Sequence, residues 1–186
     1  MGKKSSELSD KQISFIEQQH MFFVATAADT GHVNLSPKGG DSLRVLSPTR
    51  IAWLNLTGSG NESAAHVLQN KRMTIMWSAF DGAPLILRSY GTARAIHSND
   101  PEWEELYAMF PDNPGARQIF IQDITLVQSS CGMAVPNYEH VNDRDNLDKL
   151  AKHLGEEGIQ QYWLEKNQQS IDGFDTEIAE RAKFDA

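Results

Sequence analysis

The chain has 186 residues, of which 40% are hydrophobic and 23% charged, and its formal net charge is −8. This length suits one well-buried domain and is short for two. The 17 lysines and arginines form no run, which argues against a nucleic-acid surface, because phosphate backbones are bound by clustered basic side chains.

Cysteine usage indicates a reducing compartment, and the hydropathy pattern shows neither a membrane span nor a signal peptide. Cys131 is the only cysteine, so no intrachain disulfide can form. No apolar stretch approaches the roughly eighteen residues that cross a bilayer. The residues after Lys3 and Lys4 lack the apolar core of a signal peptide. We therefore expect a cytoplasmic protein that has no membrane or nucleic-acid partner.

The first half of the chain predicts short elements separated by turn residues. After a polar tail over residues 1–7, Ser9 and Gln12 have the spacing of a capping box. The predicted elements are a short helix after Ser9, strands over 22–26 and 33–36 joined at 29–31, an apolar strand over 50–56, and a helix from Asn61 to Gln69.

The second half begins with strands and ends with charged helical segments. Gly91 interrupts a long β-like run, where a bulge would fit. The predicted elements are strands over 73–77 and 84–97, a helix over 100–110, strands over 118–122 and 124–127, and helices around 145–154 and 158–167. Six or seven strands without a βαβ rhythm favour a largely antiparallel sheet or barrel with helices at its periphery, in one domain over 1–186.

Two loops carry the residue types of an anion site. The first, residues 32–41, contains Lys38 and two glycines, and the second is Thr57–Gly58–Ser59–Gly60–Asn61–Glu62–Ser63. Glycine lets the backbone approach a ligand closely, and exposed N–H groups and helix N-termini attract anions. The loops predict an anionic cofactor over a sheet, although neither a P-loop nor a Rossmann spacing is present. The alternatives are a plain Gly-Ser-Gly turn and a solvated Lys38.

Other candidate residues also have purely structural explanations. Arg88, Tyr90 and Arg94 share one face of a strand, where arginines meet solvent, an anionic ligand or a partner subunit. The six histidines show no metal-ligand spacing, so we expect no metal. Cys131 lacks a local catalytic signature, which favours a buried, inert thiol over a nucleophile.

Taken in order, the segments from Phe22 to Val127 resemble the pyridoxamine 5'-phosphate oxidase-like, FMN-binding split-barrel family. The resemblance rests on a strand, the Ser-Pro-Lys-Gly-Gly loop, a strand, the Gly-Asn-Glu-Ser helix start, and two further strands, the second containing a glycine. It implies a six-stranded antiparallel split β-barrel with peripheral helices and a helical extension from about residue 137. It also implies a homodimer with two FMN sites at its interface.

The same resemblance assigns roles to particular residues. Lys38 stands where the family has a lysine on the flavin phosphate, and Leu54 and Asn55 stand along the flavin edge. Asn61–Glu62–Ser63 replaces a Ser-Arg-Lys element, so neutral donors must carry more of the phosphate binding. The predicted cofactor-binding residues are Val33, Asn34, Leu35, Ser36, Lys38, Leu54, Asn55, Thr57, Asn61, Glu62, Ser63 and Arg88.

The function implied by this resemblance is an FMN-dependent oxidoreductase that acts on a small molecule, with NAD(P)H as a candidate electron donor. The arginine-rich C-terminal motif of true pyridoxamine 5'-phosphate oxidases is missing, so we do not expect that reaction. Two alternatives stay open: a non-catalytic flavin-binding or flavin-sensing protein, and a deazaflavin-dependent reductase. The pattern identifies no catalytic acid or base.

Overall fold

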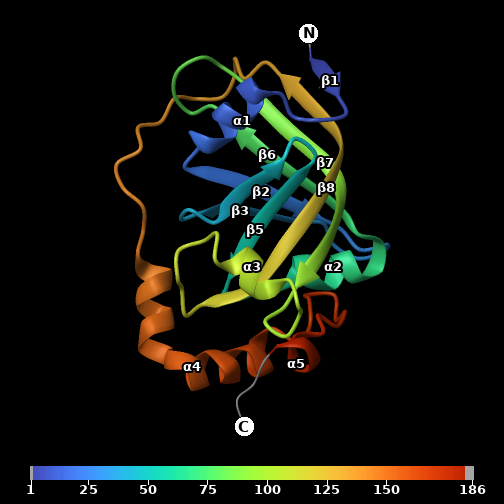
Figure 1. Ribbon diagram of the computed structural model, residues 1–186, viewed down its shortest axis with the longest axis vertical. Helices are drawn as coiled ribbons and strands as arrows, with labels where there is room; N and C mark the ends of the chain where they lie inside the picture. The colour runs from blue at the N-terminus through green and yellow to red at the C-terminus, as the bar shows by residue number, and fades with distance from the viewer. Residues whose placement is uncertain (1, 183–186) are drawn as a thin grey trace.

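The structure is a computed structural model that describes residues 2–182, and in this range eight strands form one curled, antiparallel sheet (Figure 1). The strands are β1 (Lys3–Ser5), β2 (Met21–Thr26), β3 (Asn34–Gly39), β4 (Leu43–Ser47), β5 (Arg50–Leu56), β6 (Arg72–Ser78), β7 (Ile86–Ile96) and β8 (Ala116–Ser130). Their order is β3-β2-β6-β7-β8-β5-β4, and β1 pairs with the end of β8. The two ends of this path, β3 and β4, form the edges between which the barrel is split.

The antiparallel split barrel predicted from the sequence is confirmed, with eight strands in place of six. The polar tail predicted to be frayed over residues 1–7 is ordered at residues 3–5, where the prediction is wrong because β1 pairs with residues 127–129. All three β1 residues are exposed, so this strand forms by backbone pairing and leaves no hydrophobic pattern. The sequence also did not predict β4, whose Leu43 and Val45 pack against the core.

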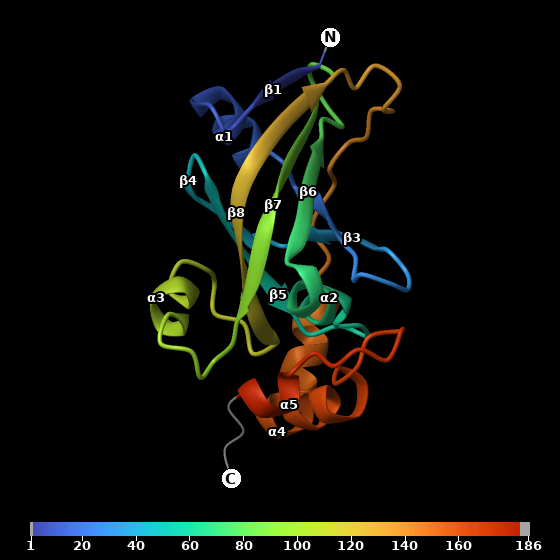
Figure 2. The same cartoon turned by 90° about the vertical axis from the view of Figure 1, so that its right-hand side faces the viewer.

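The two longest strands meet at a bulge. The register between β7 and β8 shifts between Tyr90 and Gly91, as the sequence predicted. A Cβ at Gly91 would overlap the carbonyl oxygen of Asp123, so only glycine fits there. The two strands predicted over 118–122 and 124–127 are one continuous strand, β8, which curves through the middle of the sheet (Figure 2).

The helices lie around the barrel and below one of its ends. They are α1 (Asp10–Glu17), α2 (Glu62–Asn70), α3 (Trp103–Tyr107), α4 (Asn146–Lys166) and α5 (Ile178–Arg181). The capping box before α1 is confirmed. The helix predicted over 100–110 is wrong in extent, because the Asp100 carboxylate accepts the His97 N–H and pairs with Arg181 instead of capping a helix.

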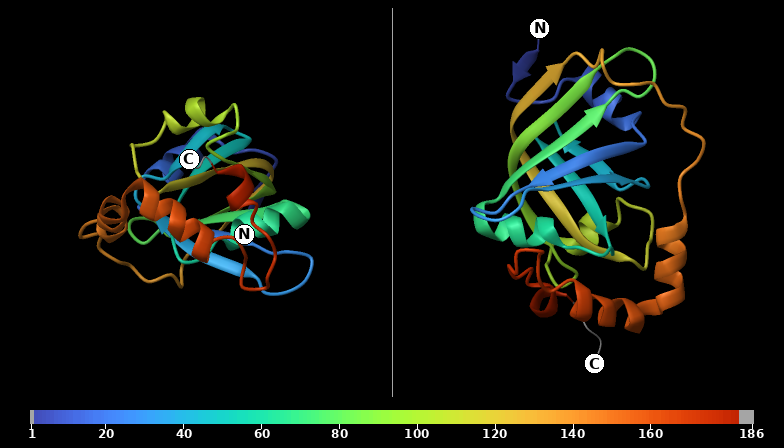
Figure 3. Two further views of the ribbon diagram at one scale, coloured as in Figure 1. Left: turned by 90° about the horizontal axis from the view of Figure 1, so that it is seen from below. Right: turned by 180° about the vertical axis from the view of Figure 1, so that it is seen from behind.

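Helix α4 turns a corner at Gly155, whose φ is 65°, so its two halves correspond to the two predicted helical segments. Figure 3 shows α4 and α5 lying across the open end of the barrel. They pack on each other through a small apolar cluster that includes Ile159, Trp163 and Ile178. No helix in the described range is both long and apolar enough to span a membrane.

The hydrophobic core has two main parts on opposite faces of the sheet. The larger part fills the barrel and includes Trp53, Trp77 and Phe120. The smaller part lies on the outer face of β5 and β8, where α3 covers Leu54 and Ile119. Trp53 and Leu54 therefore face opposite ways, as neighbouring residues of a strand must.

Candidate functional site

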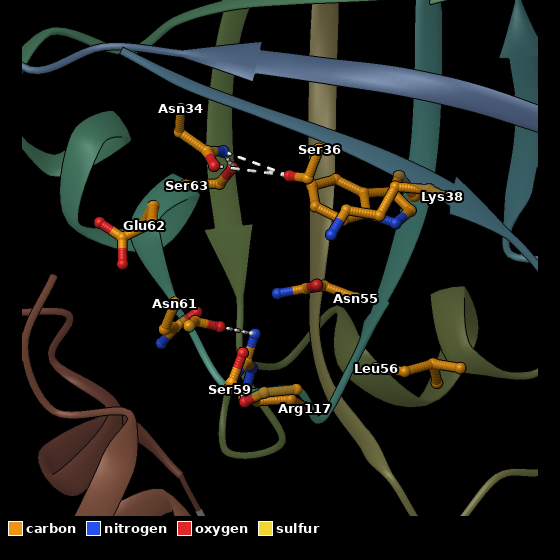
Figure 4. Close-up of a pocket in the computed structure, with 13 residues that line it drawn as sticks. Asn34, Ser36, Lys38, Asn55, Leu56, Ser59, Asn61, Glu62, Ser63 and Arg117 are labelled. Atoms are coloured by element: carbon orange, nitrogen blue, oxygen red, sulfur yellow. Dashed lines mark hydrogen bonds between the residues drawn. The ribbon is translucent and has the colours of Figure 1, made fainter. Parts of the chain in front are cut away.

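A cavity of about 310 Å³ lies at the split of the barrel, between β3 on one side and β5 on the other (Figure 4). The loop from β5 to α2 and the start of β8 close its lower end. It is lined by Asn34, Ser36, Lys38, Trp53, Asn55, Leu56, Gly58, Ser59, Gly60, Asn61, Glu62, Ser63 and Arg117. The two loops singled out in the sequence thus meet at one cavity.

Strand alternation decides which predicted residues reach this cavity. On β3, Asn34, Ser36 and Lys38 line it, whereas Val33 and Leu35 are 74% and 63% exposed. On β5, Asn55 lines it and Leu54 packs in the outer core. Val33, Leu35 and Leu54 were predicted as parts of contiguous segments, and the structure does not place them in the cavity.

The start of α2 contributes a compact set of polar groups. Asn61, Glu62 and Ser63, three of the predicted cofactor-binding residues, all line the cavity. The first N–H groups of a helix have no partner within the helix and form the positive end of its dipole. Thr57 is not a lining residue, because its hydroxyl donates to the carbonyl of Gly115 at 2.9 Å and accepts the Trp163 indole N–H at 2.8 Å.

Lys38 extends from β3 into the cavity and lies over the ring of Trp53. Its Nζ lies 5.2 Å from the centroid of the Trp53 ring. Burial, together with the positive charge of Arg117, lowers the pKa of Lys38 to about 8. The ammonium is therefore charged at neutral pH and poorly hydrated.

Arg117 is a second cation in the cavity, and the sequence reasoning missed it. It is 3% exposed, and burial lowers its pKa to about 9. It donates to the Asn167 side-chain oxygen at 2.6 Å and to the Gly60 carbonyl at 3.0 Å. Its Nε has no hydrogen-bond partner within residues 2–182. Alternation alone would place Arg117 on the outer face with Ile119, but the register between β5 and β8 shifts here and leaves Arg117 unpaired at a bulge, which no local sequence pattern indicates.

The two cations have no counter-charge among residues 2–182. Neither Lys38 nor Arg117 forms an ion pair there. The carboxylate that lines the cavity, Glu62, accepts the backbone N–H of Ile171 at 3.0 Å. Buried charges are normally paired. The arrangement can accept an anion such as a phosphate group at the start of α2.

A C-terminal strap, residues 167–175, contacts Arg117 and the loop between β5 and α2 but contributes no lining residue to the cavity. Asn167 receives the Arg117 hydrogen bond and donates to the Gly58 carbonyl at 3.0 Å. Asp172 accepts the backbone N–H of His32 at 2.8 Å and pairs with its ring, which raises the pKa of that histidine. The strap therefore connects the loop between β5 and α2 to the turn between β2 and β3.

Two residues considered in the sequence lie away from the cavity. Arg88, a predicted cofactor-binding residue, is not among the lining residues, and its guanidinium donates to the Ser130 hydroxyl at 3.1 Å. Cys131 is exposed, so the predicted buried thiol is wrong. The reason is that Cys131 directly follows the end of β8, where the chain leaves the sheet.

The fold and the cavity define a split-barrel protein with a cationic site at the edge of its sheet. The family model of pyridoxamine 5'-phosphate oxidase matches residues 8–131. The chain is also 35% identical over 184 residues to the pyridoxamine 5'-phosphate oxidase family protein ustO of Aspergillus flavus, covering 89% of this chain and 74% of that protein. The chain therefore belongs to the pyridoxamine 5'-phosphate oxidase family.

Solved structures share the barrel at low sequence identity. A candidate pyridoxamine 5'-phosphate oxidase from Lactobacillus delbrueckii is 21% identical with a TM-score of 0.53, and the match covers 66% of this chain and 94% of that one. HupZ of Group A Streptococcus is 17% identical with a TM-score of 0.50, covering 63% and 89%. Both comparisons cover the barrel fold and carry no information on the ligand.

Proposed function

We propose that this protein is a flavoprotein that holds FMN by its phosphate in the cavity between Lys38 and Arg117. The observation that carries this proposal is the pair of desolvated cations without a carboxylate partner at the start of α2. Family membership and the resemblance of the two loops to FMN-binding split barrels support a flavin as the ligand.

The residues present fit a phosphate, with one change from the family pattern. Asn61–Glu62–Ser63 lacks the cations expected at the helix start, and Arg117 from β8 supplies one of them. Lys38 and Arg117 would hold the phosphate charge, while the Ser59 and Ser63 hydroxyls and the first N–H groups of α2 donate to its oxygens. The unpartnered Nε of Arg117 is a further donor.

The remaining lining residues would position the rest of the ligand. Asn34, Ser36 and Asn55 would supply uncharged polar groups, and Trp53 would supply an apolar surface. A bound flavin supplies redox chemistry, and the protein supplies position, electrostatics and exclusion of water. We therefore propose an FMN-dependent oxidoreductase that acts on a small molecule in the cytoplasm, a location that suits its single cysteine.

The proposal is tested by the colour and cofactor content of the purified full chain. We expect visible flavin absorbance, release of FMN on denaturation, bleaching by NADH or NADPH, and recovery in air. K38A should lower FMN occupancy, and K11A, at an exposed lysine of α1, should not. A colourless protein from cells supplied with riboflavin contradicts flavin binding. A deazaflavin in the extract contradicts FMN, and a yellow protein that neither nucleotide bleaches contradicts NAD(P)H as the electron donor.

We also propose that two copies form a homodimer through the outer face of β3. Leu35 of this edge strand and Val33 just before it are exposed, and Ile171 of the strap is 78% exposed beside them, since Asp172 binds His32. Exposed apolar side chains grouped in this way are typical of a protein interface. Sedimentation should give a dimer for the wild type and a monomer for L35E. A monomeric wild type contradicts the proposal.

A further inference from the structure

A chain of polar side chains runs from the cavity wall into the barrel and ends at a buried histidine. The Ser63 hydroxyl lines the cavity and lies 3.2 Å from the Thr26 hydroxyl. The Thr26 hydroxyl in turn lies 3.1 Å from Nδ1 of His66, which is 1% exposed. The Asn34 amide donates to the Ser63 oxygen at 3.2 Å from the other side.

The far end of this chain selects one form of the imidazole. Nε2 of His66 is buried and has no hydrogen-bond partner among the described residues. A proton on Nε2 would bury an N–H donor without an acceptor, which is costly and is the rarer kind of unsatisfied group. A proton on Nδ1 instead has an acceptor in the Thr26 oxygen. Of the two tautomers, the Nδ1–H one is therefore the one that this environment favours.

The tautomer of His66 determines which way the hydroxyl hydrogens of Thr26 and Ser63 point. With the proton on Nδ1, His66 donates to Thr26, and Thr26 donates to Ser63. The Ser63 oxygen then accepts from both Thr26 and Asn34, so its own hydrogen is free to point into the cavity. With the proton on Nε2 the order reverses, and Ser63 presents only lone pairs to an anion.

We infer that His66 is a positioning residue which, through Thr26, directs the Ser63 hydroxyl hydrogen towards an anionic ligand in the cavity. This inference rests on the anion site of the proposed function. His66 itself does not touch the ligand, because Thr26 lies between it and Ser63. A neutral donor fixed in this way complements the two cations without adding a third buried charge.

The first test measures the tautomer directly and needs no ligand. The full chain labelled with ¹⁵N-histidine gives long-range proton–nitrogen spectra in which a protonated and a bare ring nitrogen resonate far apart. H66N identifies the His66 signals by their disappearance. We expect a protonated Nδ1 and a bare Nε2. A protonated Nε2 overturns the inference, whatever the cavity binds.

The second test measures binding of inorganic phosphate by calorimetry, with any bound nucleotide first removed. S63A, T26V and H66L should each weaken phosphate binding by roughly three- to tenfold, the effect of losing one hydrogen bond. The T26V/S63A double variant should bind no more weakly than S63A alone, because both changes remove the same donor. H66N, which keeps a side-chain N–H, should recover most of the affinity.

The control for these variants is T74V. It removes a hydroxyl from β6, the strand next to β2, and Thr74 is not one of the hydrogen-bonded side chains that link Ser63 to His66. It should bind phosphate like the wild type. Wild-type affinity in T26V, or additive losses in the double variant, overturns the relay while leaving the anion site intact. Absence of phosphate binding in the wild type and every variant contradicts the anion site itself, and the role of Ser63 with it.

Discussion

Lys38 and Arg117 carry an electrostatic cost that the free protein does not offset. Both side chains lose hydration on folding, and the charge of Arg117 further disfavours the charged form of Lys38. Strand β3 and the start of β8 bring them together from positions far apart in the chain. A bound anion would supply the missing counter-charge. The two unpaired cations therefore lower the stability of the free protein and raise its affinity for an anion.

The first prediction concerns the pH dependence of anion binding. Because the pKa of Lys38 is about 8, phosphate affinity should be highest below this pH and should fall as the pH rises through it. Calorimetry across about pH 7 to 9 measures this decline. K38M should bind more weakly at the lower pH and show a smaller decline. An unchanged slope in K38M would show that another group titrates.

The same shift has the opposite sign for the stability of the ligand-free protein. The pKa of Lys38 lies below its value of 10.5 in an unfolded chain, so the unfolded state binds more protons between about pH 8 and 10.5. The contribution of Lys38 to the free energy of unfolding therefore increases with pH in this window, while phosphate affinity decreases. Denaturant titrations of wild type and K38M at the two ends of the window separate these effects.

The second prediction concerns Asn167, whose neutral side chain contacts Arg117. A carboxylate at this position would pair with the Arg117 guanidinium. The side-chain oxygen of Asn167 lies 2.6 Å from a guanidinium nitrogen of Arg117. N167D places a carboxylate there, which would neutralise Arg117 and weaken phosphate binding by at least about tenfold, the effect of a charge-assisted hydrogen bond. N167A should weaken binding less, because Arg117 keeps its charge.

Calorimetry measures the affinity of the Asn167 variants, and thermal unfolding serves as the control for folding. N167D should retain a cooperative transition, since the new carboxylate pairs with a buried cation. Binding equal to the wild type in a folded N167D would mean that the ligand does not use the charge of Arg117.

At the scale of elements, β3 and β5 show how alternation builds a site from ordinary strands. Every second residue of β3 is polar and lines the cavity, and the residues between them are exposed at the edge of the sheet. The loop after β5 then places glycines and the start of α2 at the lower end. Binding groups therefore come from strand faces and a helix terminus, whose geometry is fixed by backbone pairing.

The sequence predicted most of these elements and several of the site residues, for identifiable reasons. Turn residues and apolar runs indicated the hairpin of β2 and β3, the buried β5 and the start of α2. Arg117 was missed because its contact with the loop depends on the pairing of β5 with β8, which one sequence does not specify. Strand β1 was missed because its exposed residues leave no hydrophobic pattern.

The third prediction tests the bulge between β7 and β8. G91A would drive a methyl group into the backbone at Asp123 and Ile124 and should destabilise the fold by about 1–3 kcal/mol, the usual cost of overpacking. Chemical denaturation measures the loss. G58A is the matched control, because a Cβ at Gly58 meets no atom within 4 Å, and its stability should stay near that of the wild type. Equal stability of the two variants would contradict the packing argument.

At the scale of the whole molecule, the barrel and the C-terminal helices share polar contacts as well as apolar ones. Trp163 of α4 donates to Thr57, and Asn167 binds both Arg117 and the loop. Arg181 of α5 also pairs with Asp100, which lies between β7 and α3. Residues outside the matched family region 8–131 thus hold Arg117 and the loop that line the cavity, and loosening them should weaken anion binding as well as stability.

The fourth prediction concerns the acid stability of this assembly and centres on His97. This residue is fully buried, and neither ring nitrogen has a hydrogen-bond partner in the described range. Burial, reinforced by the charge of Arg181, lowers the pKa of His97 to about 4. In the unfolded chain the pKa returns to 6.5, so the unfolded state binds more protons between these values. The contribution of His97 to the free energy of unfolding is therefore fully present above pH 6.5 and is lost as the pH falls towards 4.

The size of this loss is roughly 3 kcal/mol, since each unit of pKa difference corresponds to about 1.4 kcal/mol. Urea titrations at a series of pH values measure it as a fall in the free energy of unfolding. H97M has no titrating group at this position and should lose much of the fall, even where it is less stable at neutral pH. H153N, at an exposed histidine of α4, should keep the wild-type slope. A wild-type slope in H97M would place the acid sensitivity of the barrel at another group.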